Sequence, residues 1–270
     1  MSRPLESVDC FLLDMDGTFY LGENLLPGAL DFIETIRQQG KDFIFLTNNS
    51  SKHRRQYVEK ISRLGLPIGE EKVFTSGEAT ARYLATHYPG ARLFVAGTPS
   101  LQEEFTAHGF CVTEVEPQMV VLGFDTSLTY QKLWRFCDLV RDGLPYYATH
   151  PDINCPTPEG FMPDIGALMA CVKASTGRDP DLIIGKPNRI IVEELARKQN
   201  LALNSIAMIG DRLYTDIALG ETAGIETVLM LSGETQRQDL TTSPFQPNLV
   251  FENLGEMARW MREAVKREAL

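Results

Sequence analysis

The sequence predicts an α/β fold in which a parallel sheet covered by helices carries a second, smaller α/β domain inserted into it. Short apolar runs alternate with stretches of helical spacing almost from end to end, as in strand–helix–strand units. Polar residues suited to chemistry follow the apolar runs of the two outer blocks, and the middle block has strands of its own. We therefore expect one sheet domain built from residues 1–80 and 179–270, with residues 81–178 inserted as the second domain.

The N-terminal block shows the alternation most clearly. Strands are expected at residues 10–13 and 43–46, with a helix between them at residues 28–39. Pro27 precedes this helix and Gly40 follows it, as is usual at helix ends. The same patterns predict strands at residues 93–96, 119–122, 146–148, 182–184, 206–209 and 226–231, and helices at residues 54–64, 130–141, 164–174 and 256–265, with a helical stretch from the Gly210-Asp211 turn to Ala218.

Length and composition are those of a globular protein with one large or two medium domains: 270 residues, 43% hydrophobic and 23% charged. The net charge of −10 gives no support to nucleic-acid binding, which needs clustered Lys and Arg. The N-terminal sequence lacks the apolar stretch of a signal peptide, and no apolar run has the length of a membrane span. We expect a cytoplasmic protein whose five widely spaced cysteines are reduced thiols rather than zinc ligands or disulfides.

Two aspartates follow the first expected strand, in the sequence Asp14-Met15-Asp16-Gly17-Thr18. Two carboxylates two residues apart at a strand end form an anionic site, and Mg²⁺ prefers such hard oxygen ligands. An aspartate held against Mg²⁺ is also suited to act as a nucleophile, because carboxylates form aspartyl-phosphate intermediates. Taken alone, the same residues fit a turn in which Asp16 caps the next element.

Two further polar segments follow expected strands and suit a phosphate group. The sequence TNNSS at residues 47–51 offers hydroxyls, amides and the N–H groups of a helix N-terminus. Lys186, in the sequence GKP, would neutralise phosphate charge during transfer. Taken alone, the first segment fits an N-cap loop, and the lysine fits an exposed loop.

The fourth polar segment, GDRLYTD at residues 210–216, follows the expected strand 206–209. Asp211 would give the metal a second carboxylate, and Asp216 would orient Asp211, a metal-bound water or Lys186. By itself this segment fits a helix cap with an acidic first turn. In combination, the four segments place a nucleophile, a hydroxyl, a lysine and a second carboxylate at strand ends that we expect one sheet to bring together.

These four segments resemble the four motifs of the haloacid dehalogenase superfamily, and the resemblance covers the whole chain. The matching strings are LLDMDGTFYLG, TNNSS, IGKPN and GDRLYTDI. The long insertion between the second and third motifs, with ATHPD inside it, is similar to subfamily IIA, which includes NagD-like and para-nitrophenyl-phosphatase-like proteins. The resemblance implies a Rossmann-like core with an inserted α/β cap, and a phosphatase that hydrolyses small phosphate monoesters.

The resemblance also implies a role for each matching residue. Asp14 would attack the phosphorus, and Asp16 would protonate the leaving alkoxide and then activate the water that hydrolyses the aspartyl phosphate. Mg²⁺ would be held by Asp14, Asp211 and the backbone carbonyl of Asp16, with Asp216 outside this ligand set. Thr47 would grip the phosphate and Lys186 would offset its charge. The residues expected at the phosphate or the substrate are Gly17, Thr47, Asn48, Asn49, Lys186 and Asn154.

In subfamily IIA the insertion covers the active site, excludes water and contacts the substrate. Residues 149–156 are the segment that we expect to reach the site, although His150 and Asp152 fit a role in fixing the loop equally well. The expected partner is a small phosphorylated metabolite. A homodimer stays open, because cap-mediated dimers occur among relatives.

Other functions are compatible with parts of the pattern. Receiver domains of response regulators also gather acidic residues, a Thr or Ser and a Lys around Mg²⁺. They are shorter, however, and they lack an acid two residues after the phosphorylated Asp. A phosphomutase shares the first half-reaction, and the sequence does not separate it from a phosphatase. A catalytically idle binding module is disfavoured because all the groups that catalysis needs are present.

Overall fold

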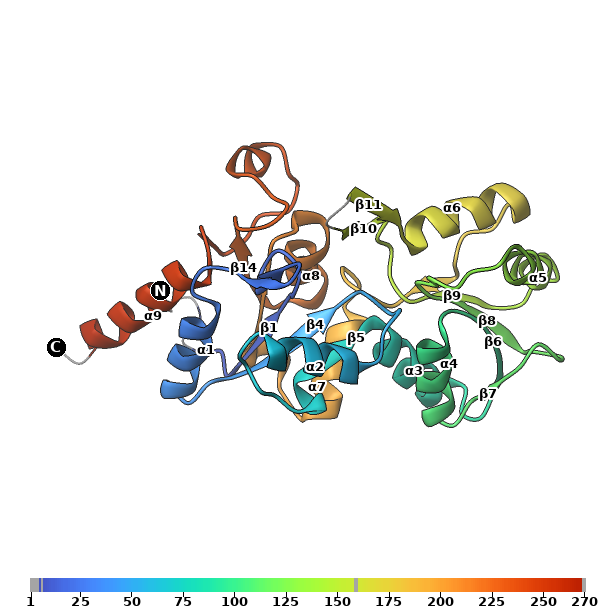
Figure 1. Cartoon of the computed structure of the whole chain (residues 1–270), viewed down its shortest axis with the longest axis horizontal. Coiled ribbons are helices and arrows are strands. Elements are labelled where there is room, and N and C mark those ends of the chain that lie inside the picture. Colours follow the sequence, from blue (N-terminus) through green and yellow to red (C-terminus); the bar gives the residue numbers. More distant parts are fainter. Residues whose placement is uncertain (1–4, 6, 158–159, 269–270) are drawn as a thin grey trace. The chain divides into compact units, whose positions relative to one another are not determined.

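The computed structural model describes residues 5, 7–157 and 160–268, and the chain forms two compact units (Figure 1). Each unit is built on its own parallel sheet. The first unit contains Met1–Leu46, Val58–Val73 and Ala196–Leu270, and the second contains Thr47–Tyr57 and Phe74–Leu195.

The larger sheet has six strands in the order β15-β14-β13-β1-β4-β5. Counted along the chain, this order reads 6-5-4-1-2-3, the arrangement of a doubly wound Rossmann-like sheet, and it confirms the predicted fold class. Its switch point lies between β1 and β13, where the winding reverses. The strands are β1 (Cys10–Leu13), β4 (Asp42–Thr47), β5 (Val73–Thr75), β13 (Ile206–Gly210), β14 (Glu226–Met230) and β15 (Leu249–Phe251).

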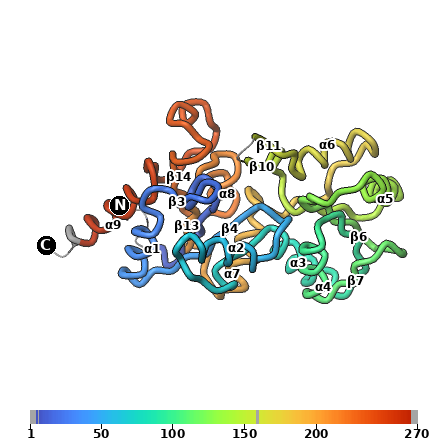
Figure 2. Tube along the Cα trace, in the orientation of Figure 1, coloured from blue at the N-terminus to red at the C-terminus, as the bar shows by residue number. Residues whose placement is uncertain are grey.

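Two helices of the first unit, α1 (Ala29–Gln38) and α9 (Leu254–Glu268), lie side by side (Figures 1 and 2). Arg262 of α9 donates to Asp31 at 2.8 Å and to Thr35 at 2.7 Å, which joins the two helices. On its inner face, α1 packs Phe32 against Phe11 of β1, with ring centroids 5.7 Å apart. Burial of one such side chain contributes about 1.5–3 kcal/mol, so the apolar stripe of α1 fixes it to the sheet.

The smaller sheet has five parallel strands in the order β12-β9-β8-β6-β7. Read from the other end and counted along the chain, this order is 2-1-3-4-5, the second common doubly wound arrangement. Its switch point lies between β6 and β8. The strands are β6 (Arg92–Ala96), β7 (Cys111–Val112), β8 (Met119–Leu122), β9 (Tyr146–Ala148) and β12 (Leu182–Ile183).

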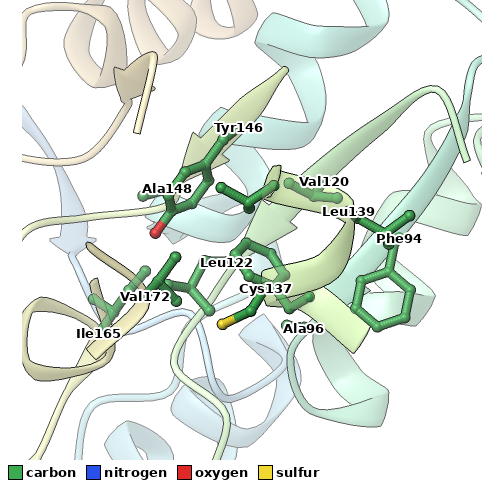
Figure 3. Close-up of a cluster of buried hydrophobic side chains, with 12 residues drawn as sticks. Phe94, Ala96, Val120, Leu122, Cys137, Leu139, Tyr146, Ala148, Ile165 and Val172 are labelled. Atoms are coloured by element: carbon green, nitrogen blue, oxygen red, sulfur yellow. The ribbon is translucent and has the colours of Figure 1, made fainter. Parts of the chain in front are cut away.

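Side chains alternate across the five-stranded sheet, so both of its faces are buried. Val120, Leu122 and Tyr146 belong to the cluster packed against α5 and α6 (Figure 3). Val121 and Tyr147 belong to the cluster packed against α3 and α4 on the opposite face. The second unit is therefore a three-layer α/β/α unit. Its helices are α3 (Ser76–His87), α4 (Pro99–Ala107), α5 (Tyr130–Arg141) and α6 (Ile165–Thr176).

Helix starts in the second unit follow ordinary capping chemistry. Thr98 accepts the Leu101 N–H at 3.3 Å, with Pro99 in the first turn of α4. Thr129 caps α5 in the same way, through the Lys132 N–H at 3.1 Å. A capping residue directly before an apolar-patterned stretch explains why the helix at residues 130–141 could be predicted.

One expectation from the sequence is wrong, and another is refined by the structure. The strand before Lys186, β12, pairs with β9, so it belongs to the five-stranded sheet and not to the sheet that carries Asp14 and Asp211. Only two half-buried residues form this strand, and so short an apolar run does not reveal its partner. The expected helical stretch to Ala218 is confirmed as helical: it is a π-helical turn, η3 (Leu213–Ile217), and the α-helix α8 (Ala218–Ala223) continues it.

Two short antiparallel hairpins complete the sheets, and neither was predicted. One of them begins at Asn154, which the sequence had suggested to lie in a loop. Within the described part of the chain, no helix combines the length and the hydropathy that a membrane span requires. The remaining elements are β2 (Tyr20–Leu21), β3 (Asn24–Leu25), β10 (Asn154–Thr157), β11 (Gly160–Pro163), α2 (Arg54–Arg63), α7 (Ile190–Gln199), η1 (Glu70–Lys72), η2 (Leu203–Ser205) and η4 (Arg237–Thr241).

Candidate active site

Three carboxylates gather at the switch point of the six-stranded sheet. Asp14 directly follows β1, Asp211 directly follows the neighbouring strand β13, and Asp216 lies in the turn η3. Oxygen atoms of the three carboxylates lie within 4.8 Å of one another. Doubly wound sheets bind their ligands at this point, beyond the carboxyl ends of the strands. The acidic cluster therefore occupies the position where the fold places a site.

Asp211 is enclosed by main chain on several sides and is only 2% exposed. Its Oδ2 accepts the Glu234 N–H at 2.6 Å, and its Oδ1 lies 3.4 Å from the Thr18 hydroxyl that donates to it. Gly17, with φ +87°, and Gly233 pass so close that a Cβ on either would overlap the Asp211 carboxylate. Glycine is needed at both positions because the carboxylate fills the space that a side chain would take.

The cluster has the chemistry of a divalent cation site. Burial and the nearby Asp216 carboxylate raise the pKa of Asp211 from 3.8 to about 7, an effect that the Glu234 N–H only partly offsets. A raised carboxyl pKa indicates that positive charge is in deficit here, so a bound cation would stabilise the ionised cluster. Carboxylate oxygens are hard donors, which suit Mg²⁺ better than a metal that prefers nitrogen or sulfur. The residues present fit the Mg²⁺ expected from the sequence.

Asp16 has a different environment from Asp14. Asp14 is half-buried, whereas Asp16 is exposed, and its carboxylate is not among the three that form the acidic cluster. Asp16 lies in the turn that leads from β1 into the first hairpin, where the Gly17 N–H donates to the Tyr20 carbonyl at 2.8 Å. The two aspartates of the first motif thus differ in exposure, with Asp14 half-buried in the cluster and Asp16 exposed.

The loop after β14 also contributes to the site, and the prediction from sequence missed it. The Ser232 hydroxyl donates to the Gly17 carbonyl at 2.9 Å. The Glu234 carboxylate lies 3.0 Å from Nε of Arg212 and accepts the Tyr214 hydroxyl at 2.8 Å. A signal was available, because Ser-Gly-Glu follows an apolar run in the same way as the four segments that were singled out.

In the second unit, the Asn48 side chain holds the main chain of Lys186. Asn48 Oδ1 accepts the Lys186 N–H at 2.8 Å, and Asn48 Nδ2 donates to the Lys186 carbonyl at 3.0 Å. Nδ2 also donates to Asp152 Oδ1 at 3.1 Å. Both Asn48 and Lys186 are buried, at 5% and 2% exposure. The structure thus brings these two predicted site residues together, with Asp152 beside them.

Thr47 and Asn49 shape the turn in which Asn48 lies. Thr47 Oγ1 accepts the Asn49 N–H at 3.1 Å. Asn49 Oδ1 accepts the Ser51 N–H at 2.9 Å and the Ser51 hydroxyl at 2.7 Å. This is an Asx-type turn, so the side-chain oxygen of Asn49 serves the backbone of its own segment.

His150 is fully buried and fixes the segment that begins at residue 149. Its Nδ1 lies 3.0 Å from Thr149 Oγ1, and its Nε2 lies 3.0 Å from Oδ1 of Asp164, the N-cap residue of α6. Of the two roles left open by the sequence, these contacts support loop fixing for His150. Asn154 is exposed and pairs with Pro163 across the second hairpin.

Comparison with known proteins gives matches along nearly the whole chain. The haloacid dehalogenase-like hydrolase family matches residues 11–111, and the HAD-hydrolase-like family matches residues 183–257. The chain is 34% identical over 246 residues to the 5'-nucleotidase YutF of Bacillus subtilis, covering 91% of this chain and 96% of that protein. It is 32% identical over 256 residues to an acid sugar phosphatase of Staphylococcus saprophyticus, covering 94% and 98%.

Solved structures extend the same likeness. The crystal structure of a 4-nitrophenylphosphatase from Thermotoga maritima matches with a TM-score of 0.93 and 48% identity, covering 96% of this chain and 99% of that one. These relatives are named as phosphatases, which confirms the expected class of phosphoric monoester hydrolase. The resemblance drawn from the four sequence motifs is also confirmed: the chain belongs to the haloacid dehalogenase-like hydrolases, in subfamily IIA.

Proposed function

We propose that this chain is a Mg²⁺-dependent phosphatase that transfers the phosphoryl group of a small phosphate monoester to Asp14 and then to water. The observation that carries the proposal is the position of Asp14. It follows β1 at the switch point, with a carboxylate oxygen within 4.8 Å of those of Asp211 and Asp216. A carboxylate at the ligand-binding edge of such a sheet, in a cluster that favours a cation, is suited to attack a phosphate ester.

The reaction has two steps, with one role for each aspartate of the first motif. An Asp14 oxygen bonds to phosphorus while the bond from phosphorus to the ester oxygen breaks, and Asp16 gives that oxygen a proton. Water then attacks the phosphorus, Asp16 takes a proton from it, and Asp14 leaves as a carboxylate. The exposure of Asp16 supports its role, because the group must reach both the leaving oxygen and the water.

The cation and its ligands complete this site. Mg²⁺ would be held by Asp14, Asp211 and the backbone carbonyl of Asp16. In that position it would offset the charge of the phosphate. Asp216 keeps Asp211 in place from outside the ligand set, because its Oδ2 accepts the Arg212 N–H at 3.1 Å and so fixes the turn after β13.

We assign phosphate binding to residues that follow other strands. β1 and β4 are parallel neighbours with Leu13 opposite Phe45, so their carboxyl ends, which lead to Asp14 and Thr47, point to one edge of the sheet. In this proposal residues 81–178 are the cap domain, and residues 1–80 and 179–270 are the core domain. The residues assigned to the phosphate and the substrate are Gly17, Thr47, Asn48, Asn49, Lys186 and Asn154.

The substrate class that we propose is a small phosphate monoester, such as a sugar phosphate or a nucleoside monophosphate. Relatives named as a 5'-nucleotidase, an acid sugar phosphatase and a 4-nitrophenylphosphatase support this class without selecting one member.

All five cysteines are free thiols, which supports a reducing compartment such as the cytoplasm.

We expect the purified protein to release phosphate from 4-nitrophenyl phosphate in Mg²⁺, to lose this activity in excess EDTA, and to regain it when Mg²⁺ is restored. A panel of sugar phosphates, glycerol phosphate, nucleoside monophosphates and pyridoxal phosphate then ranks substrates by kcat/KM. If the folded protein, supplied with Mg²⁺, released phosphate from none of these esters, that result would contradict the proposal. Migration of phosphate between positions of one sugar would identify a phosphomutase instead.

A further inference from the structure

The C-terminal edge of the five-stranded sheet is occupied by a segment of the chain itself. In a doubly wound sheet, the edge beyond the strand ends at the switch point is where ligands bind. Here Ser50 and Ser51, which follow the turn that holds Asn48, are buried at 2% and 8% exposure. Both residues belong to the second unit together with this sheet. The segment thus takes the place that a ligand takes in other sheets of this order.

Three strand ends hold Ser50 and Ser51 at this edge. After β6, the Thr98 hydroxyl donates to the Ser51 carbonyl at 2.9 Å. After β8, the Phe124 N–H donates to Ser50 Oγ at 3.0 Å. After β9, Thr149 Oγ1 lies 2.9 Å from Ser50 Oγ, within hydrogen-bond distance. We call these three groups (the Thr98 hydroxyl, the Phe124 N–H and the Thr149 hydroxyl) the seat.

Thr149 connects Ser50 to the buried His150. Thr149 Oγ1 lies 3.0 Å from His150 Nδ1, and His150 Nε2 lies 3.0 Å from Asp164 Oδ1. With the imidazole proton assigned to Nε2, Thr149 donates to Nδ1 and accepts from Ser50, and Ser50 accepts from the Phe124 N–H. The hydroxyls of Ser50 and Thr149 then each donate once and accept once. A buried network of this kind specifies one geometry, because each unpaired member would be costly.

We propose that the seat positions the phosphate-binding turn at Thr47 and Asn48, and that Ser50 and Thr149 are positioning residues for phosphoryl transfer. Ser50 is two residues from Asn48, whose side chain brackets the main chain of Lys186 at 2.8 and 3.0 Å. A shift of the turn therefore moves two of the groups assigned to the phosphate. The inference rests on the proposed function, because those groups must bind phosphate for their position to matter.

Two substitutions of Thr149 separate its hydroxyl from its shape. Thr149→Val keeps the shape and removes the hydroxyl, whereas Thr149→Ser keeps the hydroxyl. Thr176→Val is a matched control: it makes the same change in the same unit, at the last residue of α6, and removes a hydroxyl that donates to the Val172 carbonyl at 2.8 Å and accepts the Arg178 N–H at 3.2 Å. We expect kcat/KM for 4-nitrophenyl phosphate to fall about tenfold in Thr149→Val, because misplaced groups bind the transition state poorly. The other two variants should stay within about twofold of the wild type by the same argument.

Two further readouts accompany the kinetics. The inhibition constant of inorganic phosphate should rise in Thr149→Val alone. Amide hydrogen exchange in peptides covering residues 47–53 should also become faster in Thr149→Val alone, and this second readout does not depend on turnover.

The outcomes distinguish an error in the role proposed for the seat from an error in the proposed function. Wild-type kinetics or wild-type exchange in Thr149→Val would overturn the inference. Equal losses in Thr149→Val and Thr176→Val would also overturn it, because lower stability alone would then explain the effect. If the wild-type protein hydrolyses no ester while exchange responds as expected, the failure belongs to the proposed function and not to the seat.

Discussion

Replacement of Asp14 by asparagine is expected to lower kcat by at least about 10³-fold while the fold stays intact. An amide is a poor nucleophile toward phosphorus, and it also removes one charge from the acidic cluster. The side chains have nearly the same size, and the backbone N–H of Asp14 keeps its bond to the Ile209 carbonyl at 2.9 Å. The measurement is kcat for 4-nitrophenyl phosphate in saturating Mg²⁺, together with a thermal melt of each variant.

Asp9→Asn is the matched control for this experiment. Asp9 is exposed and lies at the other end of β1, where its backbone N–H donates to the Ser205 carbonyl at 2.8 Å and its carbonyl accepts the Asp42 N–H at 2.7 Å. We expect wild-type kcat for Asp9→Asn. Asp14 would not be the nucleophile if the Asp14→Asn variant melted at the wild-type temperature and still showed substantial Mg²⁺-dependent hydrolysis.

Asp16→Asn is expected to cause a loss that depends on the leaving group. For an alkyl phosphate such as glycerol phosphate, kcat/KM should fall about 10²-fold or more, because an alkoxide leaves slowly without a proton from a general acid. For 4-nitrophenyl phosphate the loss in kcat/KM should stay below about tenfold, because nitrophenolate leaves without one. The parameter kcat/KM is the right measure, since it reports only the steps up to departure of the leaving group.

A comparison of the two esters with one enzyme preparation controls for misfolding in Asp16→Asn. A misfolded or metal-depleted fraction lowers both activities by the same factor. Equal losses for the alkyl and the nitrophenyl ester would therefore contradict the assignment of Asp16 as the leaving-group acid.

Much of the fold and the acidic cluster could be predicted from the sequence, because they depend on local patterns. Buried parallel strands such as β1, β8 and β13 are apolar runs, and their polar ends show where an edge of the sheet carries chemistry. This reasoning singled out Asp14 and Asp211, which follow neighbouring strands and lie in one cluster.

Features that depend on pairing between distant residues could not be predicted in this way. The sheet to which β12 belongs is decided by its partner β9, and two apolar residues carry no information about that partner. The contact between Ser50 and Thr149 joins residues 99 positions apart, and each is an ordinary loop residue by local pattern. Asn154 lies in a strand because of its pairing with Pro163, although proline-bounded polar residues are typical of loops.

Chemical trapping of the aspartyl phosphate tests the proposed mechanism most directly. The Asp16→Asn variant should accumulate the intermediate from 4-nitrophenyl phosphate, because departure of nitrophenolate needs no acid while hydrolysis lacks its base. After an acid quench, borohydride reduces an acyl phosphate to an alcohol, and peptide mass spectrometry locates the change. We expect the modification at Asp14, only when Mg²⁺ and substrate are both present, and not in a variant that also carries Asp14→Asn. Nitrophenolate release without modification of Asp14, or with modification of another residue, would contradict the mechanism.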